Sequence, residues 1–149
     1  DTPSVDIAQL VQQALTFYQA GQFTQAIARW QQAVTLYQNR GDNLNQALML
    51  SYLSLAYQQM GEWSEAKTAI AQSLNLIQNS ETEAKNSKLI FAHALNTQGN
   101  LQFTQGQAEA ALATWKQATD IYKQLRDSNR TIGSLINQAQ AQQALGLFL

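Results

Sequence analysis

The chain has 149 residues, of which 45% are hydrophobic and 13% charged, with nine basic against ten acidic side chains and no cysteine. This composition predicts a soluble domain large enough to bury its own core, without disulfides or cysteine-ligated metal sites. The net charge of −1 argues against nucleic acid as a partner, because nucleic-acid binding requires clustered Lys and Arg. No apolar run reaches the roughly 18 residues that a membrane span needs, and the N-terminus lacks the pattern of a signal peptide. We therefore expect no membrane association, and the compartment stays open between cytoplasmic and exported.

The polar residues are mostly neutral amides, and the apolar residues are mostly Ala and Leu. About one residue in six is Gln, and these residue types are strong helix formers. The only proline, Pro3, lies at the extreme N-terminus, so no proline interrupts a succession of helices. We expect an all-α fold with seven helices, over residues 5–20, 23–39, 43–60, 63–79, 81–105, 108–126 and 129–146.

Three of these helices begin at side chains that are typical N-caps. Asp6 precedes the first helix, Asp42 the third, and Asp127 or Ser128 the seventh. A short polar side chain at this position accepts a hydrogen bond from a backbone N–H of the first turn.

The start of the fifth helix has two interpretations. Ser80 and Glu83 have the spacing of a capping box, which would start this helix near Glu81. Alternatively, residues 80–87 form a loose polar loop. Both alternatives stay open.

Four glycines define an internal repeat: Gly21, Gly61, Gly106 and Gly146, at spacings of 40, 45 and 40 residues. Each glycine follows a segment of helical length, and the first three also precede one, as expected of a glycine that ends a helix in the left-handed conformation. The repeating unit is therefore predicted to be a helical hairpin.

Small and bulky residues recur at fixed distances from these glycines. Small residues lie seven positions before each glycine: Ala14, Ser54, Gly99 and Ala139. Alanines lie five positions after each of the first three: Ala26, Ala66 and Ala111. Bulky residues lie nine positions after: Trp30, Ile70 and Trp115. Small residues return twelve positions after: Ala33, Ser73 and Ala118. Alternating small and bulky positions predict close packing between the two helices of each hairpin.

This pattern resembles the tetratricopeptide repeat (TPR). The residues before each glycine match the small position of the family's helix A, and the alanines after it match the most restrictive small position of helix B. Phe17 and Tyr57 match the aromatic position of helix A, and Phe23 and Trp63 match the aromatic residue after the turn. The resemblance implies a right-handed solenoid of hairpins and an interaction module without catalytic activity.

The repeats are longer than the usual 34 residues of the family and lack the proline that ordinarily ends helix B. Helices joined by Gly-Asp turns, as in QNRGDNLNQA, are similar to the long-repeat subclass of about 40 residues in kinesin light chains and bacterial signalling arrays. The segments GDNLNQALMLSYLSLAYQQMGEWSEAKTAIAQSLNLIQ and INQAQAQQALG resemble TPR arrays that precede caspase-like CHAT peptidase domains in cyanobacterial proteins, often exported ones.

The domain boundaries follow from the repeat register. We expect a single domain over residues 1–149, with repeats at about 5–40, 42–79 and 81–126 and a C-terminal capping helix at 128–146. The chain starts at Asp1 rather than Met and stops on the apolar residues 147–149, which favours a fragment of a longer protein.

Candidates for chemistry are few. His93 is the only histidine, so no pair of histidines can bind a metal. Glu62 with Glu65, and Glu81 with Glu83, lie in predicted first turns, where acidic residues favour the helix dipole. We expect no enzyme activity, no metal and no cofactor.

Aromatic and basic residues have ordinary structural interpretations. Trp30 and Trp115 are expected in the core because they occupy equivalent positions, and Trp63 is expected to be partly exposed beside its turn. A mild basic cluster near the C-terminal side is expected to be solvated: Lys116, Lys123, Arg126 and Arg130.

The resemblance implies that function lies on the concave groove formed by the inner faces of helices A. The candidate partner-binding residues are Tyr18, Gln19, Ser51, Tyr52, Leu55, Gln59, His93, Asn96, Asn100 and Asn137. Amides both donate and accept hydrogen bonds, which suits a peptide backbone, and the groove lacks paired Lys or Arg for a terminal carboxylate. We expect a protein or peptide ligand, with regulation of a catalytic domain in the same polypeptide as one extension. The alternative is a structural spacer or self-association segment.

Overall fold

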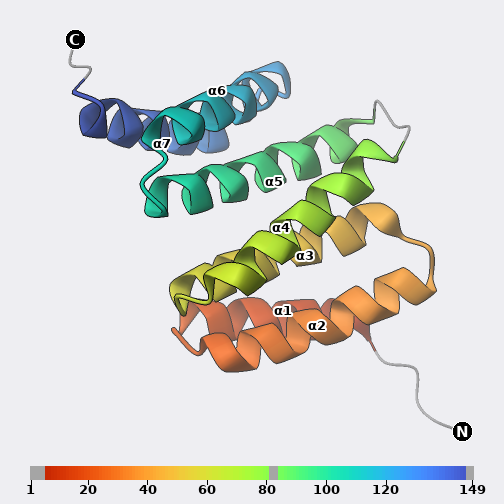
Figure 1. Cartoon of the computed structure of the whole chain (residues 1–149). Helices are drawn as coiled ribbons and strands as arrows, with labels where there is room; N and C mark the ends of the chain where they lie inside the picture. The colour runs from red at the N-terminus through yellow and green to blue at the C-terminus, as the bar shows by residue number, and fades with distance from the viewer. Residues whose placement is uncertain (1–5, 81–83, 147–149) are drawn as a thin grey trace, which may run out of the picture. The chain divides into compact units, whose positions relative to one another are not determined.

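The computed structural model describes residues 6–80 and 84–146, and all seven predicted helices are present there (Figure 1). They are α1 (Ile7–Gln19), α2 (Phe23–Asn39), α3 (Asn43–Gln59), α4 (Trp63–Gln78), α5 (Lys85–Thr104), α6 (Ala108–Gln124) and α7 (Ser128–Ala144). Residues 6–80 and 84–146 contain no strand, so the all-α class is confirmed. The sequence observations on Pro3, on Glu81 and Glu83, and on residues 147–149 lie outside the described residues.

The fifth helix begins at Lys85, four residues after the predicted start. Ala84 precedes it in extended backbone, with φ −62° and ψ 146°, and provides no side-chain cap. In the segment 80–87, for which the sequence leaves two interpretations open, residues 85–87 are helical. Ser80 lies after α4, and its hydroxyl donates to Ile77 O at 2.8 Å. The extended backbone of Ala84 places this residue outside the helix, so α5 begins at Lys85.

The predicted helix ends are confirmed at both kinds of cap. The side chains of Asp6, Asp42 and Asp127 each accept a hydrogen bond from the backbone N–H three residues later. Gly21 has φ 75°, which glycine adopts without strain, and Gln22 N donates back to Phe17 O at 2.8 Å. The other three repeat glycines also have positive φ: Gly61, Gly106 and Gly146. These caps make each chain reversal tight enough to bring two helices into contact.

The described chain forms two compact units, residues 1–76 and 77–149, and each is considered by itself. In unit 1, Ala14, Ala26 and Ala33 are fully buried around Trp30, which is 1% exposed. Two serines join α3 to α4, since Ser54 Oγ donates to Ala66 O at 2.8 Å and Ser73 Oγ donates to Ala47 O at 2.6 Å. The small positions therefore lie where two helices approach closely, as the repeat pattern predicts.

In unit 2, Trp115 takes the place that Trp30 has in unit 1. It is 1% exposed, and its Nε1 donates to Asn96 O at 3.1 Å. Gly99 lies directly against the Trp115 ring, because a Cβ at this position would lie 2.5 Å from Trp115 Cδ1. The hydroxyls of Thr119 on α6 and Ser134 on α7 lie 2.6 Å apart, and their hydrogen bond links α7 to α6. The predicted core positions of both tryptophans are confirmed.

Candidate partner-binding surfaces

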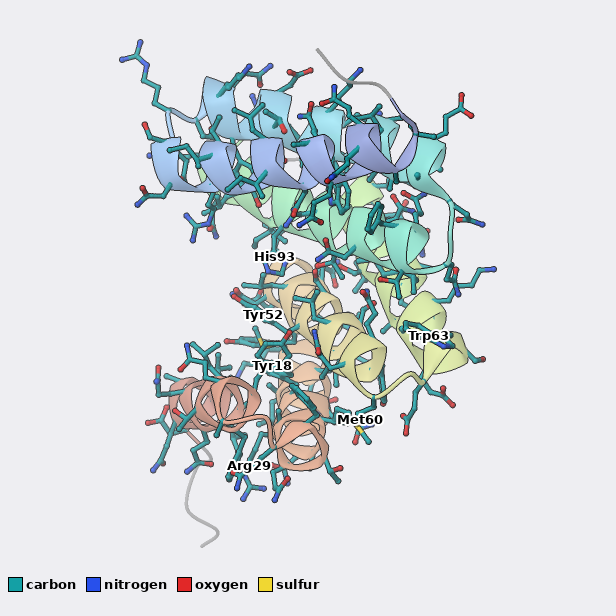
Figure 2. The ribbon with its side chains drawn as sticks, turned by 90° about the vertical axis from the view of Figure 1, so that its left-hand side faces the viewer. Tyr18, Arg29, Tyr52, Met60, Trp63 and His93 are labelled. Atoms are coloured by element: carbon teal, nitrogen blue, oxygen red, sulfur yellow. The ribbon has the colours of Figure 1, made fainter. Side chains whose placement is uncertain are left out.

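Three aromatic rings of unit 1 pack together, and we call them the aromatic patch: Tyr18, Trp30 and Tyr52. Figure 2 shows Tyr18 and Tyr52. The Trp30 ring lies 5.7 Å from Tyr18 at an angle of 50°, and 5.1 Å from Tyr52 at an angle of 10°. Trp30 is buried, whereas both tyrosines are half-buried. Because Trp30 holds both rings, α1 and α3 present two preformed aromatic side chains on the same surface.

An amide completes the aromatic patch. The Gln59 side chain forms a hydrogen bond with the Tyr18 hydroxyl. Burial raises the pKa of Tyr18 above its ordinary value of 10.0, and this hydrogen bond opposes the rise only in part. The Tyr18 hydroxyl therefore keeps its proton at neutral pH.

The other predicted residues of unit 1 differ in accessibility. Gln19 and Gln59 are exposed at the ends of α1 and α3, and Leu55 is half-buried. Ser51 is fully buried. The accessible part of the predicted set in unit 1 therefore lies around the aromatic patch.

Two predicted asparagines of unit 2 come together and form what we call the asparagine pair. Asn137 Nδ2 on α7 donates to Asn96 Oδ1 on α5 at 3.1 Å. Both side chains are half-buried. This bond uses the acceptor of Asn96 and one donor of Asn137, so the Asn96 amide nitrogen and the Asn137 amide oxygen are left for other partners. Asn100 lies about one turn further along α5 and is also half-buried.

His93 lies on α5 one turn before Asn96 and is half-buried. Burial lowers the pKa of His93 from 6.5 to about 4, and the charge of Arg130 adds to the effect. The imidazole is therefore neutral at physiological pH, with one donor and one acceptor nitrogen. A ligand that contacts His93 would therefore contact an uncharged imidazole ring.

The basic cluster of unit 2 is partly neutralised. Arg130 pairs with the Asp127 carboxylate at 2.5 Å. Hydrogen bonds from Arg130 lower the pKa of Asp127 below its ordinary value. Lys116, Lys123 and Arg126 are exposed, as expected of a solvated face.

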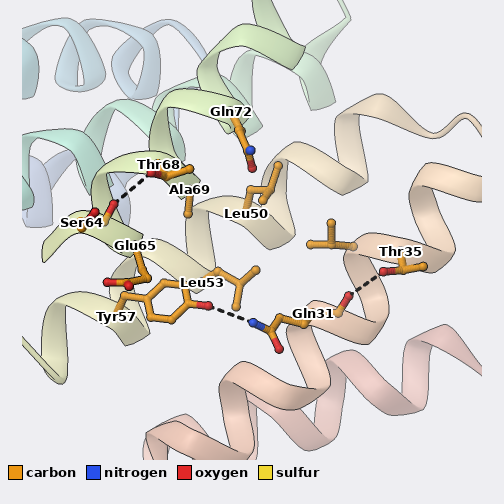
Figure 3. Close-up of a pocket in the computed structure, with 11 residues that line it drawn as sticks. Gln31, Thr35, Leu50, Leu53, Tyr57, Ser64, Glu65, Thr68, Ala69 and Gln72 are labelled. Carbon is orange, nitrogen blue, oxygen red and sulfur yellow. Dashed lines mark hydrogen bonds between the residues drawn. The ribbon is translucent and has the colours of Figure 1, made fainter. Parts of the chain in front are cut away.

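One pocket was not predicted from the sequence. It has a volume of about 450 Å³ and lies between α2 and α4, with α3 at its floor (Figure 3). Leu50 and Leu53 line its floor, and Gln31 Nε2 donates to the Tyr57 hydroxyl at 2.9 Å across its side. The repeat register predicts which residues lie on the inner faces of helices A. This pocket lies between two helices B, so the repeat register could not predict it.

Residues 6–80 and 84–146 hold no group of three or more His, Asp or Glu side chains that could bind a metal ion. Within the same ranges, no helix has the length and hydropathy to cross a membrane.

Comparisons with known proteins agree with this geometry. Residues 6–79 match the tetratricopeptide repeat family. Among solved structures, the chain matches the crystal structure of BtubC (BKLC) from P. vanneervenii with a TM-score of 0.78 and 16% identity. The match covers 99% of this chain and 61% of that one, so the chain spans less than two thirds of that structure. No curated protein matches the sequence.

At such low identity the structural match shows the fold alone, whereas the family match assigns the repeats of the N-terminal half. Tetratricopeptide repeats form non-catalytic scaffolds that generally mediate protein–protein interactions. Residues 6–79 are therefore similar to the tetratricopeptide repeat family, and the chain has a TPR-like helical repeat fold.

Proposed function

We propose that this chain binds a peptide segment of a partner protein, and that the asparagine pair of unit 2 recognises the peptide backbone. The observation that supports this most directly is the hydrogen bond from Asn137 to Asn96. It fixes the orientation of two amides on neighbouring helices A, so less side-chain entropy is lost when a ligand binds.

The chemistry of the pair matches a peptide unit. The remaining donor is the Asn96 amide nitrogen, and the remaining acceptor is the Asn137 amide oxygen. A peptide unit offers one carbonyl and one N–H, so an extended segment can bond to both amides. Asn100 would continue this contact along α5.

The aromatic patch of unit 1 would contact apolar or aromatic side chains of a ligand. Tyr18 and Tyr52 are held in place by Trp30, so their rings offer contact area at little conformational cost. None of the side chains assigned to binding is charged at neutral pH, since His93 is neutral. We therefore expect an uncharged stretch of peptide rather than an acidic C-terminus.

The test begins with a random-peptide phage library selected on the purified chain, followed by calorimetric titration of the enriched peptide. Asn96→Ala and Asn137→Ala should each weaken binding about tenfold, the equivalent of one hydrogen bond of about 1.4 kcal/mol. Asn129→Ala is the matched control, because Asn129 is an exposed asparagine at the start of α7. Unchanged affinity in both Asn96→Ala and Asn137→Ala would contradict the proposal.

Two finer expectations stay predictions. Regulation of a peptidase-like domain follows only from the resemblance to CHAT-associated arrays. A structural spacer or self-association segment is the alternative, and light scattering across a concentration series distinguishes it. A mass that grows with concentration without ligand would favour self-association, whereas a constant monomer mass with a specific peptide would favour recognition.

A further inference from the structure

Three basic side chains of unit 2 line one pocket, which we call the basic pocket. It has a volume of about 510 Å³ and lies where the start of α5 meets the turn between α6 and α7. Lys85, Arg126 and Arg130 line it. Among the described residues of its lining, Asp127 is the only acidic one. The basic pocket therefore contains three positive charges against one negative charge.

The carboxylate of Asp127 is already engaged by one of the three cations. Its Oδ1 accepts from Arg130 N at 3.1 Å, and its Oδ2 accepts from Arg130 Nη1 at 2.5 Å. These hydrogen bonds lower the pKa of Asp127, and the charge of Lys85 adds to the effect, so Lys85 also lies near this carboxylate. The carboxylate is therefore ionised and holds Arg130 in place, but it offsets only one of the three positive charges.

The other two cations are open to a ligand. Lys85 and Arg126 are both exposed. Within residues 6–80 and 84–146, neither of them forms an ion pair. A surplus of two positive charges in one concave site attracts anions from solution.

The backbone of Arg126 is unusual. Its φ is 58°, and it is the only residue other than glycine with a positive φ in the described part of the chain. The equivalent turn before α3 has Gly41 at this place, with φ 70°, and both turns continue with the aspartate that caps the next helix. Glycine adopts this conformation without strain, whereas an L-residue does not. Arg126 thus occupies a position where glycine would cost the fold less, which favours a role for its side chain.

A phosphate monoester matches the charge of the basic pocket. It carries a charge of about −1.5 to −2 at neutral pH, close to the surplus of two positive charges. A guanidinium group can bond to two phosphate oxygens at once, and a lysine adds a compact positive charge. A single carboxylate would neutralise only half of the surplus, so the charge favours the phosphate.

We propose that the basic pocket binds a phosphate group, carried either by a phosphorylated side chain of a partner protein or by a free phosphate compound. Arg126 and Lys85 contact its oxygens, and Arg130 contributes its charge from the position that Asp127 fixes. The site is separate from the asparagine pair, because neither Asn96 nor Asn137 lines the basic pocket.

The experiment follows the backbone amide resonances of the full chain by nuclear magnetic resonance at constant ionic strength. One titration uses inorganic phosphate, and a second uses the peptide acetyl-Gly-phosphoserine-Gly-amide. Saturable shifts are expected for residues 125–130, and the unphosphorylated peptide should cause none. Saturation by the phosphopeptide at lower concentration supports a phosphorylated partner. Saturation by inorganic phosphate at the same or lower concentration supports a free phosphate compound.

Arg126→Gly separates binding from folding. It should weaken phosphate binding about tenfold or more, because it removes a charged hydrogen-bond donor. At the same time it should raise the urea midpoint of unfolding, because glycine relieves the positive φ. Lys85→Gln should weaken binding similarly. Lys116→Gln is the matched control, since Lys116 is exposed on α6 outside the basic pocket and the substitution also removes one positive charge.

Three outcomes would overturn the proposal. The first is a set of shifts that do not saturate, or that sodium chloride reproduces. The second is binding that stays within about twofold of the native chain in both Arg126→Gly and Lys85→Gln. The third is a loss in Lys116→Gln as large as that in Arg126→Gly, which would assign the effect to net charge rather than to the basic pocket. None of these results depends on the asparagine pair, so the two proposals can fail separately.

Discussion

Replacing Gly99 with alanine should destabilise unit 2, because the Trp115 ring occupies the space of the new methyl group. The added Cβ would lie 2.5 Å from Trp115 Cδ1 and 2.8 Å from Cε2, and still closer to Nε1. The ring has little freedom to move, since it is 1% exposed, packs against Phe103 and donates to Asn96 O. Either the ring or α5 must shift.

The expected cost follows from three contributions. Overpacking a full core costs about 1–3 kcal/mol. Displacing the ring from Asn96 O leaves a buried N–H without a partner, which costs about 1–3 kcal/mol more. Alanine recovers up to about 1 kcal/mol through its higher helix propensity. We expect the free energy of unfolding to fall by about 3 kcal/mol, a large part of the roughly 5–15 kcal/mol of an ordinary domain.

Gly133→Ala is the matched control. Gly133 also lies inside a helix, but it is exposed, and an added Cβ would meet nothing within 4 Å. This variant should be more stable than the native chain by about 0.5–1 kcal/mol. Urea titrations followed by far-ultraviolet circular dichroism measure both variants.

The double variant Gly99→Ala, Trp115→Phe tests the physical cause. Phenylalanine is smaller and has no N–H, so the two substitutions should be strongly non-additive. A Gly99→Ala variant that is as stable as Gly133→Ala, or additive effects in the double variant, would refute the assignment of the strain to Trp115.

Three further predictions concern single side chains. Ser73→Ala should lower the free energy of unfolding, measured in urea, by only about 0.5–1.5 kcal/mol, because it removes one hydrogen bond to Ala47 O. The equivalent positions of the other repeats, Ala33 and Ala118, already hold alanine. A loss of more than about 3 kcal/mol would contradict this prediction. Asp127→Ala should raise the unfolding rate and cost about 1 kcal/mol, the usual effect of a lost N-cap, whereas Asp127→Asn should restore most of it. The pKa of His93 is about 4 in the folded chain against 6.5 for an exposed histidine, so the unfolded chain binds the extra proton and stability falls as the pH falls from 6.5 to 4. The free energy of unfolding falls by about 3 kcal/mol by the time the pH is below 4. His93→Gln should make the free energy of unfolding depend less on pH, as measured by urea titrations at successive pH values.

Much of the fold was predictable because its determinants are local. Gly21 ends α1 through its own positive φ, and Asp42 caps α3 through a bond to the third residue on, so both boundaries depend on a few neighbouring residues. The start of α5 was not predictable in the same way. Ser80 and Glu83 have a capping spacing, but a spacing does not decide whether the backbone between them is helical, and α5 begins only after Ala84.

The candidate site was predictable only as a set of positions. The repeat register identifies which residues of helices A lie on one face, and Asn96 and Asn137 are both among them. Their mutual hydrogen bond could not be predicted, because it joins residues 41 positions apart and depends on how α7 packs beside α5. Burial is equally non-local, and Ser51 lies in the predicted set although it is fully buried.

The two candidate surfaces have a common origin in the repeat register. Tyr52 lies nine positions before Gly61 and stacks on Trp30 of the preceding repeat. Asn137 lies nine positions before Gly146 and bonds to Asn96 of the preceding repeat. The same position of helix A therefore joins the second repeat to the first with an aromatic ring, and α7 to the third repeat with an amide.

The residue seven positions before the glycine differs between the two units, and so do the contacts of the tryptophan that packs against it. Gly99 lets Trp115 reach the backbone of α5, and Trp115 Nε1 bonds to Asn96 O. In unit 1, Ala14 has a methyl group at this position, and Trp30 Nε1 has no hydrogen-bond partner among the described residues. The Trp30 ring instead contacts Tyr18 and Tyr52. The tryptophan therefore supports an aromatic surface in unit 1, whereas in unit 2 it bonds to the backbone of the helix that carries the asparagine pair.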